Sequence, residues 1–286
     1  MIATSIAPSE RLGIQSAAIA SWLEHGFRVR SVNSQSEIDA IETVFAGVEF
    51  VAPPRTAEAY VGKPLVFVSD VLGALKPGEA PVFGVVNSDI YLPPREGLGA
   101  WLAHECADAM VIGQRLEVEE FGAESGTPDR FGFDCFFFGD EMVRDVSVEK
   151  FMMGRSNWDF WLPLEAINRG LTLKRLDPPF IQHVPHEVHS APDILVFGNY
   201  LADYLAQMMR RKAGSDKDAA AEAAAFAKRH HRLLEGAARA EKETDEDERF
   251  RLLAELASFY DSLAGMASKT IRDSAVPLDW RTGAGA

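Results

Sequence analysis

The sequence predicts an α/β protein in which a mostly parallel sheet, flanked by helices, is followed by an all-helical C-terminal appendage. Over the first two thirds of the chain, short apolar runs rich in β-branched residues alternate with stretches of helical spacing, the pattern of parallel strands joined by helices. The last third repeats its apolar residues at helical spacing only. We therefore expect a sheet domain over 1–190, a helical appendage over 191–275 and a flexible tail over 276–286.

Four strands separated by helices are expected in the first half of the chain. Pro8 stops the first apolar run, and the polar triplet Asn87-Ser88-Asp89 interrupts the fourth. Ligands of such sheets bind at the carboxyl ends of the strands, so we expect a site among the residues that directly follow these runs. The strands are expected at 2–7, 28–33, 48–52 and 81–92, and the helices after Ser9, after Ser36 and over 66–75.

The rest of the sheet domain is expected to hold three more strands and one helix. Proline disrupts a helix interior, so Pro163 predicts that this helix begins near Trp161. Beyond 190, Ser190, Ser215 and Thr244 each precede an Asp by three positions, as in a capping box, and are expected to open three helices. The strands are expected at 109–114, 131–138 and 171–182, a loop at 119–130 and the helix within 154–170.

Charge and composition exclude several classes of protein. The 286 residues include 47% hydrophobic and 25% charged side chains and carry a formal net charge of -14, so nucleic acid and anionic lipid are repelled. A nucleotide diphosphate is also repelled unless a cation intervenes. The sequence contains no P-loop, G-x-G-x-x-G or G-x-S-x-G pattern, which argues against an ATPase, a dinucleotide enzyme and an α/β-hydrolase.

The sequence favours a location in the cytoplasm. No stretch approaches the ~20 apolar residues of a transmembrane helix, and the first residues lack the basic start and long apolar core of a signal peptide. Cys106 and Cys135 can form at most one disulfide, which does not suggest a disulfide scaffold. We expect a soluble protein in a reducing compartment.

Asp89 is the first candidate for chemistry. It lies between the apolar residues 82–86 and 90–92, and a carboxylate buried there without a partner is costly. If Asp89 faces inward it should bind a cation, and Mg²⁺ accepts carboxylate oxygens while keeping positions open for substrate phosphates. The alternative is that the strand ends at Asn87 and that Asp89 faces water in a turn.

Several segments, in order and spacing, resemble the GT-A glycosyltransferases, which use nucleotide-diphospho-sugars. The resemblance covers the predicted sheet domain and says nothing about the helices that follow. The residues Thr4–Pro8 resemble the first strand of these enzymes, Val85–Ile90 a variant of their DxD motif, Phe133–Phe138 the D-x-F-x-F strand after it, Gly154–Trp161 the G-R-x-x-W-D-x-W segment of a bacterial family-2-like group, and His183-x-x-His186 their late histidine.

The resemblance implies a glycosyltransferase that moves a sugar from a nucleotide-diphosphate donor to a saccharide or lipid-linked acceptor, as in polysaccharide biosynthesis. Mn²⁺ or Mg²⁺ would be held by Asp89 with His183 or His186. The chain departs from the family at Asn87, where the first acidic residue of the motif belongs, so one carboxylate remains there. Without the family, the histidines are either a zinc site of no known template or ordinary loop residues.

Asp159 is the expected general base. An inverting transfer needs a carboxylate to remove the proton of the acceptor hydroxyl, and the neighbouring Trp158 and Trp161 can hold its rotamer or stack on a sugar ring. The alternative is an acidic residue in the first turn of a helix, where the helix dipole favours it.

Nine residues are expected on the nucleotide and donor side of the site. Lys63, Arg115 and Arg155 can supply counter-charges for phosphates, and Asn33 ends a strand where it can hold a base or ribose. Asp134 is either a sugar ligand or the buried partner of an arginine. The nine are Pro8, Asn33, Lys63, Asn87, Ser88, Arg115, Asp134, Arg155 and Trp158.

Two other functions stay open. A nucleotidyltransferase acting on a sugar phosphate would use a related fold, but residues 7–13 after the first strand lack its Gly-rich loop. A non-catalytic scaffold would retain a decayed metal site at Asn87. The apolar stripes of the C-terminal helices favour packing, either onto the sheet domain or in a homo-oligomer.

Overall fold

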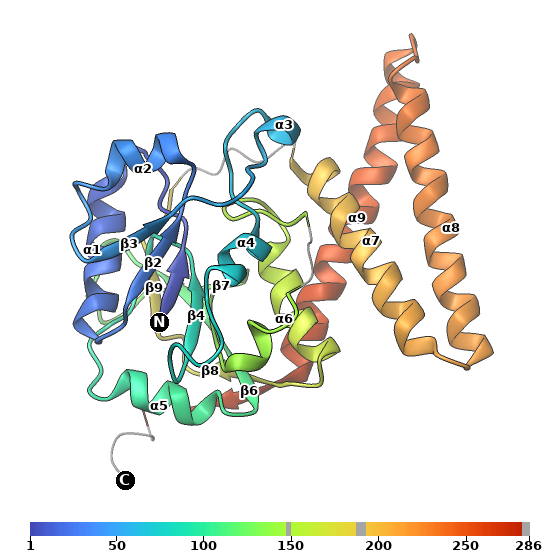
Figure 1. The fold of residues 1–286 in the computed structure, drawn as a ribbon. Coiled ribbons are helices and arrows are strands. Elements are labelled where there is room, and N and C mark those ends of the chain that lie inside the picture. The colour runs from blue at the N-terminus through green and yellow to red at the C-terminus, as the bar shows by residue number, and fades with distance from the viewer. Residues whose placement is uncertain (147–149, 187–192, 282–286) are drawn as a thin grey trace. The chain divides into compact units, whose positions relative to one another are not determined.

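Figure 1 shows the structure, a computed structural model that describes residues 1–146, 150–186 and 193–281. The chain forms two compact units, here called the sheet unit and the helical unit. In the sequence, the helical unit is therefore flanked on both sides by parts of the sheet unit. The sheet unit consists of Met1–Gly154, Leu162–Val188 and Ile271–Ala286, and the helical unit of Arg155–Trp161 and His189–Thr270.

Within the described residues, the sheet unit contains one mixed, mostly parallel sheet of 10 strands. Most strands follow the order β10-β8-β6-β7-β4-β1-β2-β3, and β5 and β9 pair with each other beside β6. Neighbours run parallel except where β7 pairs with β4 and β6, and where β5 pairs with β9. The strands are β1 (Ile2–Thr4), β2 (Val29–Val32), β3 (Val48–Val51), β4 (Phe83–Val86), β5 (Ile90–Tyr91), β6 (Ala109–Glu117), β7 (Thr127–Phe138), β8 (Thr172–Leu176), β9 (Ile181–His183) and β10 (Ala275–Leu278).

Helices flank the sheet and form the helical unit. None of the described helices is long and apolar enough to cross a membrane. The predicted α/β class, with helices toward the C-terminus, is confirmed. The helices are α1 (Leu12–Glu24), α2 (Gln35–Ile41), α3 (Glu58–Val61), α4 (Val68–Gly73), α5 (Leu98–Glu105), a 3-10 turn (Asp140–Met142), α6 (Trp158–Asn168), α7 (Asp193–Ala213), α8 (Lys217–Ala240) and α9 (Glu246–Ser274).

The two faces of the sheet bury different partners, as β2 shows. Val29 joins an apolar core with Trp22 of α1 and Phe137 of β7. Its neighbour Arg30 points to the opposite face and donates to the carbonyl of Ala74, which follows α4. Because successive residues of a strand point to opposite faces, α1 covers one face of the sheet and α4 the other.

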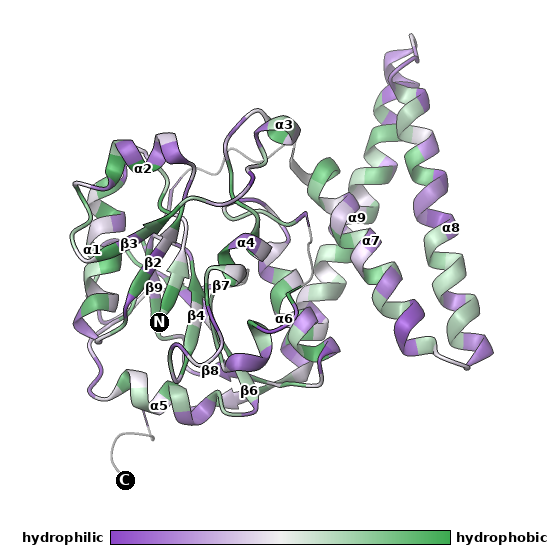
Figure 2. Ribbon diagram, viewed as in Figure 1, coloured by the Kyte–Doolittle hydropathy of each residue, from purple (hydrophilic) through white to green (hydrophobic). Residues whose placement is uncertain are grey.

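The helical unit packs through a glycine and aromatic rings. Gly198 of α7 lies so close to Tyr260 of α9 that a Cβ atom there would come within 2.3 Å of the side chain. Phe226 of α8 lies against Phe259 of α9, with ring centroids 5.7 Å apart. Figure 2 shows hydrophilic and hydrophobic residues mixed along α8, whereas β4 is apolar. This mixture is typical of a helix that buries one stripe.

Two elements begin earlier than predicted. Helix α6 begins at Trp158 and contains Pro163. The amide of Trp161 already bonds the carbonyl of Asn157, so the first turn forms before the proline is reached. Strand β7 begins at Thr127, inside the expected loop, because the long strand β6 pairs with it as far as Glu117. The predicted helix start at Ser190 lies outside the described residues.

Residues 275–280 form a strand and further contacts where the sequence predicts a flexible tail from 276 onward. Residues 276–278, expected at the start of a flexible tail, belong to β10 (Ala275–Leu278), which pairs in parallel with β8. Trp280 then donates to the carbonyl of Pro178 at 2.9 Å, and its ring lies 4.5 Å from that of Phe180. Asp177 and Pro178 also divide the expected strand 171–182 into β8 and β9.

Candidate metal centre

Three strands that run in the same direction have their C-terminal ends on the same side of the sheet. β4 continues into the turn Asn87–Asp89, β6 ends at Glu117 and β9 ends at His183. Strand β5 pairs antiparallel with β9 and places Ile90 opposite His183. This register brings Asp89, the residue before Ile90, to the histidine.

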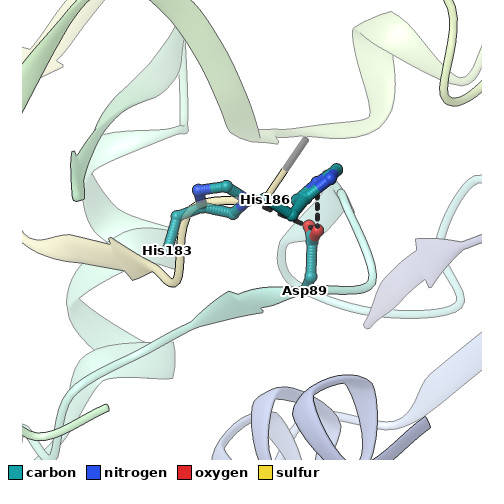
Figure 3. A group of neighbouring side chains, drawn as sticks. All are labelled: Asp89, His183 and His186. Carbon is teal, nitrogen blue, oxygen red and sulfur yellow. Dashed lines mark ion pairs between the residues drawn. The ribbon is translucent and has the colours of Figure 1, made fainter. Parts of the chain in front are cut away.

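Asp89, His183 and His186 form a compact cluster (Figure 3). Asp89 Oδ2 lies 3.4 Å from His183 Nε2 and 3.5 Å from His186 Nε2, and one possible ligand atom from each residue lies within 4.8 Å of the others. The side chain of His183 is 6% exposed and that of His186 is 39% exposed. The cluster is thus buried at His183 and open to solvent at His186.

Two further contacts fix His183. Its Nδ1 lies 2.8 Å from Glu117 Oε2, and its carbonyl accepts from the amide of Val118 at 2.9 Å. Glu117 and His183 are partners in the parallel ladder of β6 and β9, so their side chains project from the same face of the sheet. A carboxylate on the second nitrogen commonly orients a metal-binding histidine.

Arg115 connects the carboxylates behind the cluster. Its Nε lies 2.6 Å from Glu117 Oε1, its Nη2 lies 2.6 Å from Asp129 Oδ2, and its Nη1 lies 2.9 Å from Asp134 Oδ2. The other oxygen of Asp134 accepts from the side-chain amide of Asn87 at 2.6 Å. Arg115 thereby links the residue that supports His183 to the turn that carries Asp89.

The loop after β1 brings a positive charge to the cluster. Arg11 Nη1 lies 3.2 Å from Asp89 Oδ2, and its Nη2 donates to the carbonyl of Val184 at 2.8 Å. Ser88 donates to the side chain of Gln15 in α1 at 2.7 Å. The start of α1 and the loop before it therefore hold two consecutive residues of the turn.

Buried contacts fix the backbone on both sides of the turn. Trp22 Nε1 donates to the carbonyl of Ile90 at 2.8 Å, and Ser21 Oγ accepts from the amide of Leu92 at 3.0 Å. In β4, a Cβ atom on Gly84 would lie 2.8 Å from the ring of Phe137, so only glycine fits there. A rigid backbone of this kind preorganises a binding site.

The charges of the cluster shift the pKa values of its members. Burial raises the pKa of Asp89, but hydrogen bonds from His183 and His186 and the charge of Arg11 outweigh it and hold this pKa far below its usual value. Burial lowers the pKa of His183, but Asp89 and Glu117 reverse the effect and raise it overall. Asp89 is therefore ionised beside a positive charge, which a proton on His183 or a metal ion can provide.

Negative charge exceeds positive charge around the turn. Burial raises the pKa of Asp134 although Arg115 opposes the shift. Burial also acts against the charge of Arg115, but its carboxylate partners outweigh it and raise the pKa of the guanidinium. In the described part of the site, the carboxylates of Asp89, Glu117, Asp129 and Asp134 face the guanidinium groups of Arg11 and Arg115. A protonated His183 or a metal ion can supply further positive charge beside these carboxylates.

Three of the predicted nucleotide-binding residues lie in the sheet unit outside this network. Asn33 is buried at the end of β2, where it donates to the carbonyl of Ile6 at 2.8 Å and accepts from Ser31 at 2.6 Å. Pro8 is exposed in the loop after β1, and Lys63 is exposed after α3. The contacts of Asn33 fasten this loop, and nucleotide binding by the three residues stays a prediction.

Arg155, Trp158 and Asp159 belong to the helical unit. Trp158 is buried, and Asp159 lies in the first turn of α6, where the helix dipole favours a carboxylate. This position agrees with the structural alternative for Asp159. Its role as a general base stays a prediction.

Sequence reasoning missed four residues of the network: Arg11, Gln15, Glu117 and Asp129. Arg11 follows the first strand, so the rule that ligands bind at carboxyl ends points to it once the whole loop is considered. Glu117 was missed because the strand was expected to end at Gln114, three residues too early. For Gln15 and Asp129 the sequence offers no distinguishing pattern.

The cluster fits a divalent transition metal. Ligand atoms bound about 2.1 Å from a tetrahedral metal lie about 3.4 Å apart, close to the 3.4 and 3.5 Å between Asp89 Oδ2 and the two histidine Nε2 atoms. Two imidazoles with one carboxylate, the ligand set of many non-haem Fe²⁺ sites, suit a first-row transition metal better than Mg²⁺, which prefers oxygen ligands. Three protein ligands also leave positions for a substrate.

Comparison with known proteins gives structural similarity without a family. No protein family and no curated sequence matches the chain. The structure is similar to a mannosyltransferase from Pyrobaculum calidifontis in complex with GDP-Man and Mn²⁺, with 14% identity, a TM-score of 0.42, and coverage of 94% of this chain and 84% of that chain.

Two further structures illustrate the range of similar proteins. For the galactosyltransferase LgtC in complex with donor and acceptor sugar analogs, the identity is 12%, the TM-score 0.31 and the coverage 65% of this chain and 87% of that chain. For 4-diphosphocytidyl-2C-methyl-D-erythritol synthase from Anaerococcus prevotii, the identity is 14% and the TM-score 0.39, and the match covers 68% of this chain and 94% of that chain. Because these identities and TM-scores are low, the function is inferred from the site and the sequence.

Proposed function

We propose that this protein is a divalent-metal-dependent glycosyltransferase that moves a sugar from a nucleotide-diphosphate donor to a saccharide or lipid-linked acceptor. The observation that carries the proposal is the cluster of Asp89, His183 and His186, which lies where α/β sheets bind ligands. The sequence supports it, because Asn87-Ser88-Asp89 resembles the DxD motif of GT-A glycosyltransferases.

The charge balance supports an anionic substrate that binds together with a cation. The chain has a formal net charge of -14, and carboxylates outnumber guanidinium groups around the turn. A diphosphate is repelled by such a field unless a divalent ion screens it. Asp89 with the two histidines would hold Mn²⁺, and the metal would stabilise the charge of the leaving diphosphate.

Protein groups complete the proposed donor site. Arg11 is partly exposed beside Asp89, and we assign it to a phosphate oxygen, which arginine binds well. Asn87 and Ser88 are oriented by Asp134 and Gln15, and we assign donor contacts to both. For an inverting reaction, Asp159 is the proposed base.

Calorimetry with a nucleoside diphosphate, in the presence and absence of Mn²⁺, tests the proposal. We expect the full chain to bind GDP or UDP with Mn²⁺ and far more weakly without it. Asp89→Asn should abolish the Mn²⁺ dependence, and circular dichroism at the assay temperature should show that the variant is folded. Asp39→Asn, at an exposed position of α2, is the matched control. Unchanged nucleoside diphosphate affinity of Asp89→Asn in Mn²⁺ would contradict the proposal.

The products of the reaction distinguish the alternatives. A glycosyltransferase releases a nucleoside diphosphate from a nucleotide sugar. A nucleotidyltransferase instead releases pyrophosphate from a nucleoside triphosphate and a sugar phosphate, and this result would replace the proposal. Absence of binding to every nucleoside diphosphate tested with Mn²⁺ would favour a non-catalytic scaffold.

A further inference from the structure

Carboxylates contact both ring nitrogens of His183. Its Nε2 faces Asp89 at 3.4 Å and its Nδ1 faces Glu117 at 2.8 Å. A neutral histidine has one protonated and one unprotonated nitrogen. For Nε2 to bind a metal, the proton must lie on Nδ1, and an ionised carboxylate at Nδ1 accepts that proton in a hydrogen bond.

Glu117 is itself held so that its two oxygens have different partners. Oε1 lies 2.6 Å from Arg115 Nε, and Oε2 lies 2.8 Å from His183 Nδ1. Arg115 is fixed in turn by Asp129 and Asp134. The guanidinium fixes the rotamer of Glu117, so one carboxylate oxygen is held beside Nδ1 of His183 as a hydrogen-bond acceptor.

The backbone sets the same geometry independently of the side chains. Glu117 and His183 are register partners, as are Arg115 and Ile181. The amide of Val118 donates to the carbonyl of His183 at 2.9 Å. The carboxylate is thus placed beside the imidazole by the ladder between β6 and β9, and not by a flexible loop.

We propose that Glu117 is a positioning residue that holds His183 in the tautomer with Nε2 directed at the metal, and that Arg115 holds Glu117 in place. The proposal rests on the metal-dependent function proposed above, because it assigns the support of that metal site. Glu117 binds neither metal nor substrate. Its effect passes through the ring orientation and proton position of His183.

Glu117→Gln tests the proposal with little change of shape. The glutamine amide can turn either its oxygen or its NH₂ group to Nδ1. When the NH₂ group faces Nδ1, the proton of His183 must lie on Nε2, and this nitrogen can no longer bind a metal. We therefore expect the affinity for Mn²⁺ alone, measured by electron paramagnetic resonance of the free ion, to fall about 10- to 100-fold.

Glu119→Gln is the matched control, because Glu119 is exposed and two residues away. It removes the same charge, and its Mn²⁺ affinity should stay within about twofold of the original, since salt screens exposed charges. Long-range ¹H–¹⁵N spectra of the Zn²⁺-loaded chain add a readout of the tautomer. His183 should carry its proton on Nδ1 in the original chain and lose this signature in Glu117→Gln.

The outcomes separate this proposal from the proposed function. If the original chain binds neither Mn²⁺ nor Zn²⁺, the metal-dependent function fails, and the role of Glu117 fails with it. If the original chain binds Mn²⁺ and Glu117→Gln binds it equally well, or both glutamine variants lose affinity equally, only the role of Glu117 is overturned. If Glu117→Gln does not fold, Glu117→Asp keeps the charge but shortens the reach, and weaker Mn²⁺ binding is again expected.

Discussion

Among the described residues, each unit buries one histidine, and the pKa values of the two side chains shift in opposite directions. These are His183 of the sheet unit and His230 of the helical unit. Burial lowers the pKa of both, but Asp89 and Glu117 reverse the shift of His183, whereas Asp203 only partly opposes that of His230. The partners of the two ring nitrogens, and not burial, therefore distinguish a candidate metal ligand from a packed histidine.

The surroundings of His230 explain its lowered pKa. Its Nε2 lies 3.1 Å from the hydroxyl of Tyr260, and its ring stacks on Phe259 with centroids 5.9 Å apart. The nearest carboxylate, Asp203, lies 3.6 Å from Nδ1 and is 60% exposed. A neutral imidazole is preferred there, and we interpret His230 as a link between the three long helices.

The largest expected effect comes from removing the charge behind His183. Arg115→Met should lower the free energy of unfolding by about 3–5 kcal/mol, because it leaves buried Asp134 without its cation. Urea unfolding followed by circular dichroism measures the loss. Arg28→Met, which removes an exposed arginine paired with Glu79, should cost far less. Equal losses in the two variants would show that Asp134 does not depend on Arg115.

Exchanging each histidine for phenylalanine should separate their roles. His230→Phe should cost about 1–3 kcal/mol of unfolding free energy, because the hydroxyl of Tyr260 loses its buried partner, and should leave Mn²⁺ affinity unchanged. His183→Phe should abolish Mn²⁺ binding. Calorimetry and urea unfolding on both variants give the comparison. Loss of metal binding in His230→Phe would remove the distinction between the two sites.

The pH dependence of stability should report His230. Its pKa in the folded chain is lowered, so the unfolded chain binds more protons and stability rises with pH. The contribution is present above about pH 6.5, the ordinary histidine value, and is lost as the pH falls toward the folded pKa. The unfolding free energy of His230→Phe should therefore decline less between pH 7.5 and 5.5 than that of the original chain. Parallel declines would contradict the assignment.

The smallest expected effect concerns Arg11. Arg11→Gln removes a cation that contacts Asp89, so Mn²⁺ alone should bind equally well or up to about fivefold more tightly, the scale of a partly exposed ion pair. Binding of a nucleoside diphosphate with Mn²⁺ should weaken, because a phosphate contact is lost. Calorimetry with and without the nucleotide measures both. Weaker binding of Mn²⁺ alone would mean that Arg11 supports the metal site instead.

The sequence predicts those site residues that stand out among their neighbours along the chain. Asp89 stands out because it interrupts an apolar run, and His183 and His186 share a short spacing. Their meeting depends on the pairing of β5 with β9, which no local pattern reveals. The same holds for Glu117, which becomes informative only when the parallel ladder places it beside His183.

The fold shows the same division between local and long-range information. Alternating strands and helices predict the α/β class correctly, since hydrophobic periodicity is local. Pro163 is misleading because tertiary packing overrides helix propensity. Strand β10 is unexpected because Ala275–Leu278 is short and contains Pro277, which suits an edge strand but carries no strand signal of its own.

The pairing of β10 with β8 has a consequence for how the protein is made. The longer segment of the helical unit, His189–Thr270, separates these two strands in the sequence. During synthesis, β8 therefore remains an unpaired edge until the ribosome has completed α9, and unpaired edges attract other chains. A nascent chain halted within the helical unit would present this edge to chaperones or aggregates, and the later addition of Ala275–Leu278 would cover it.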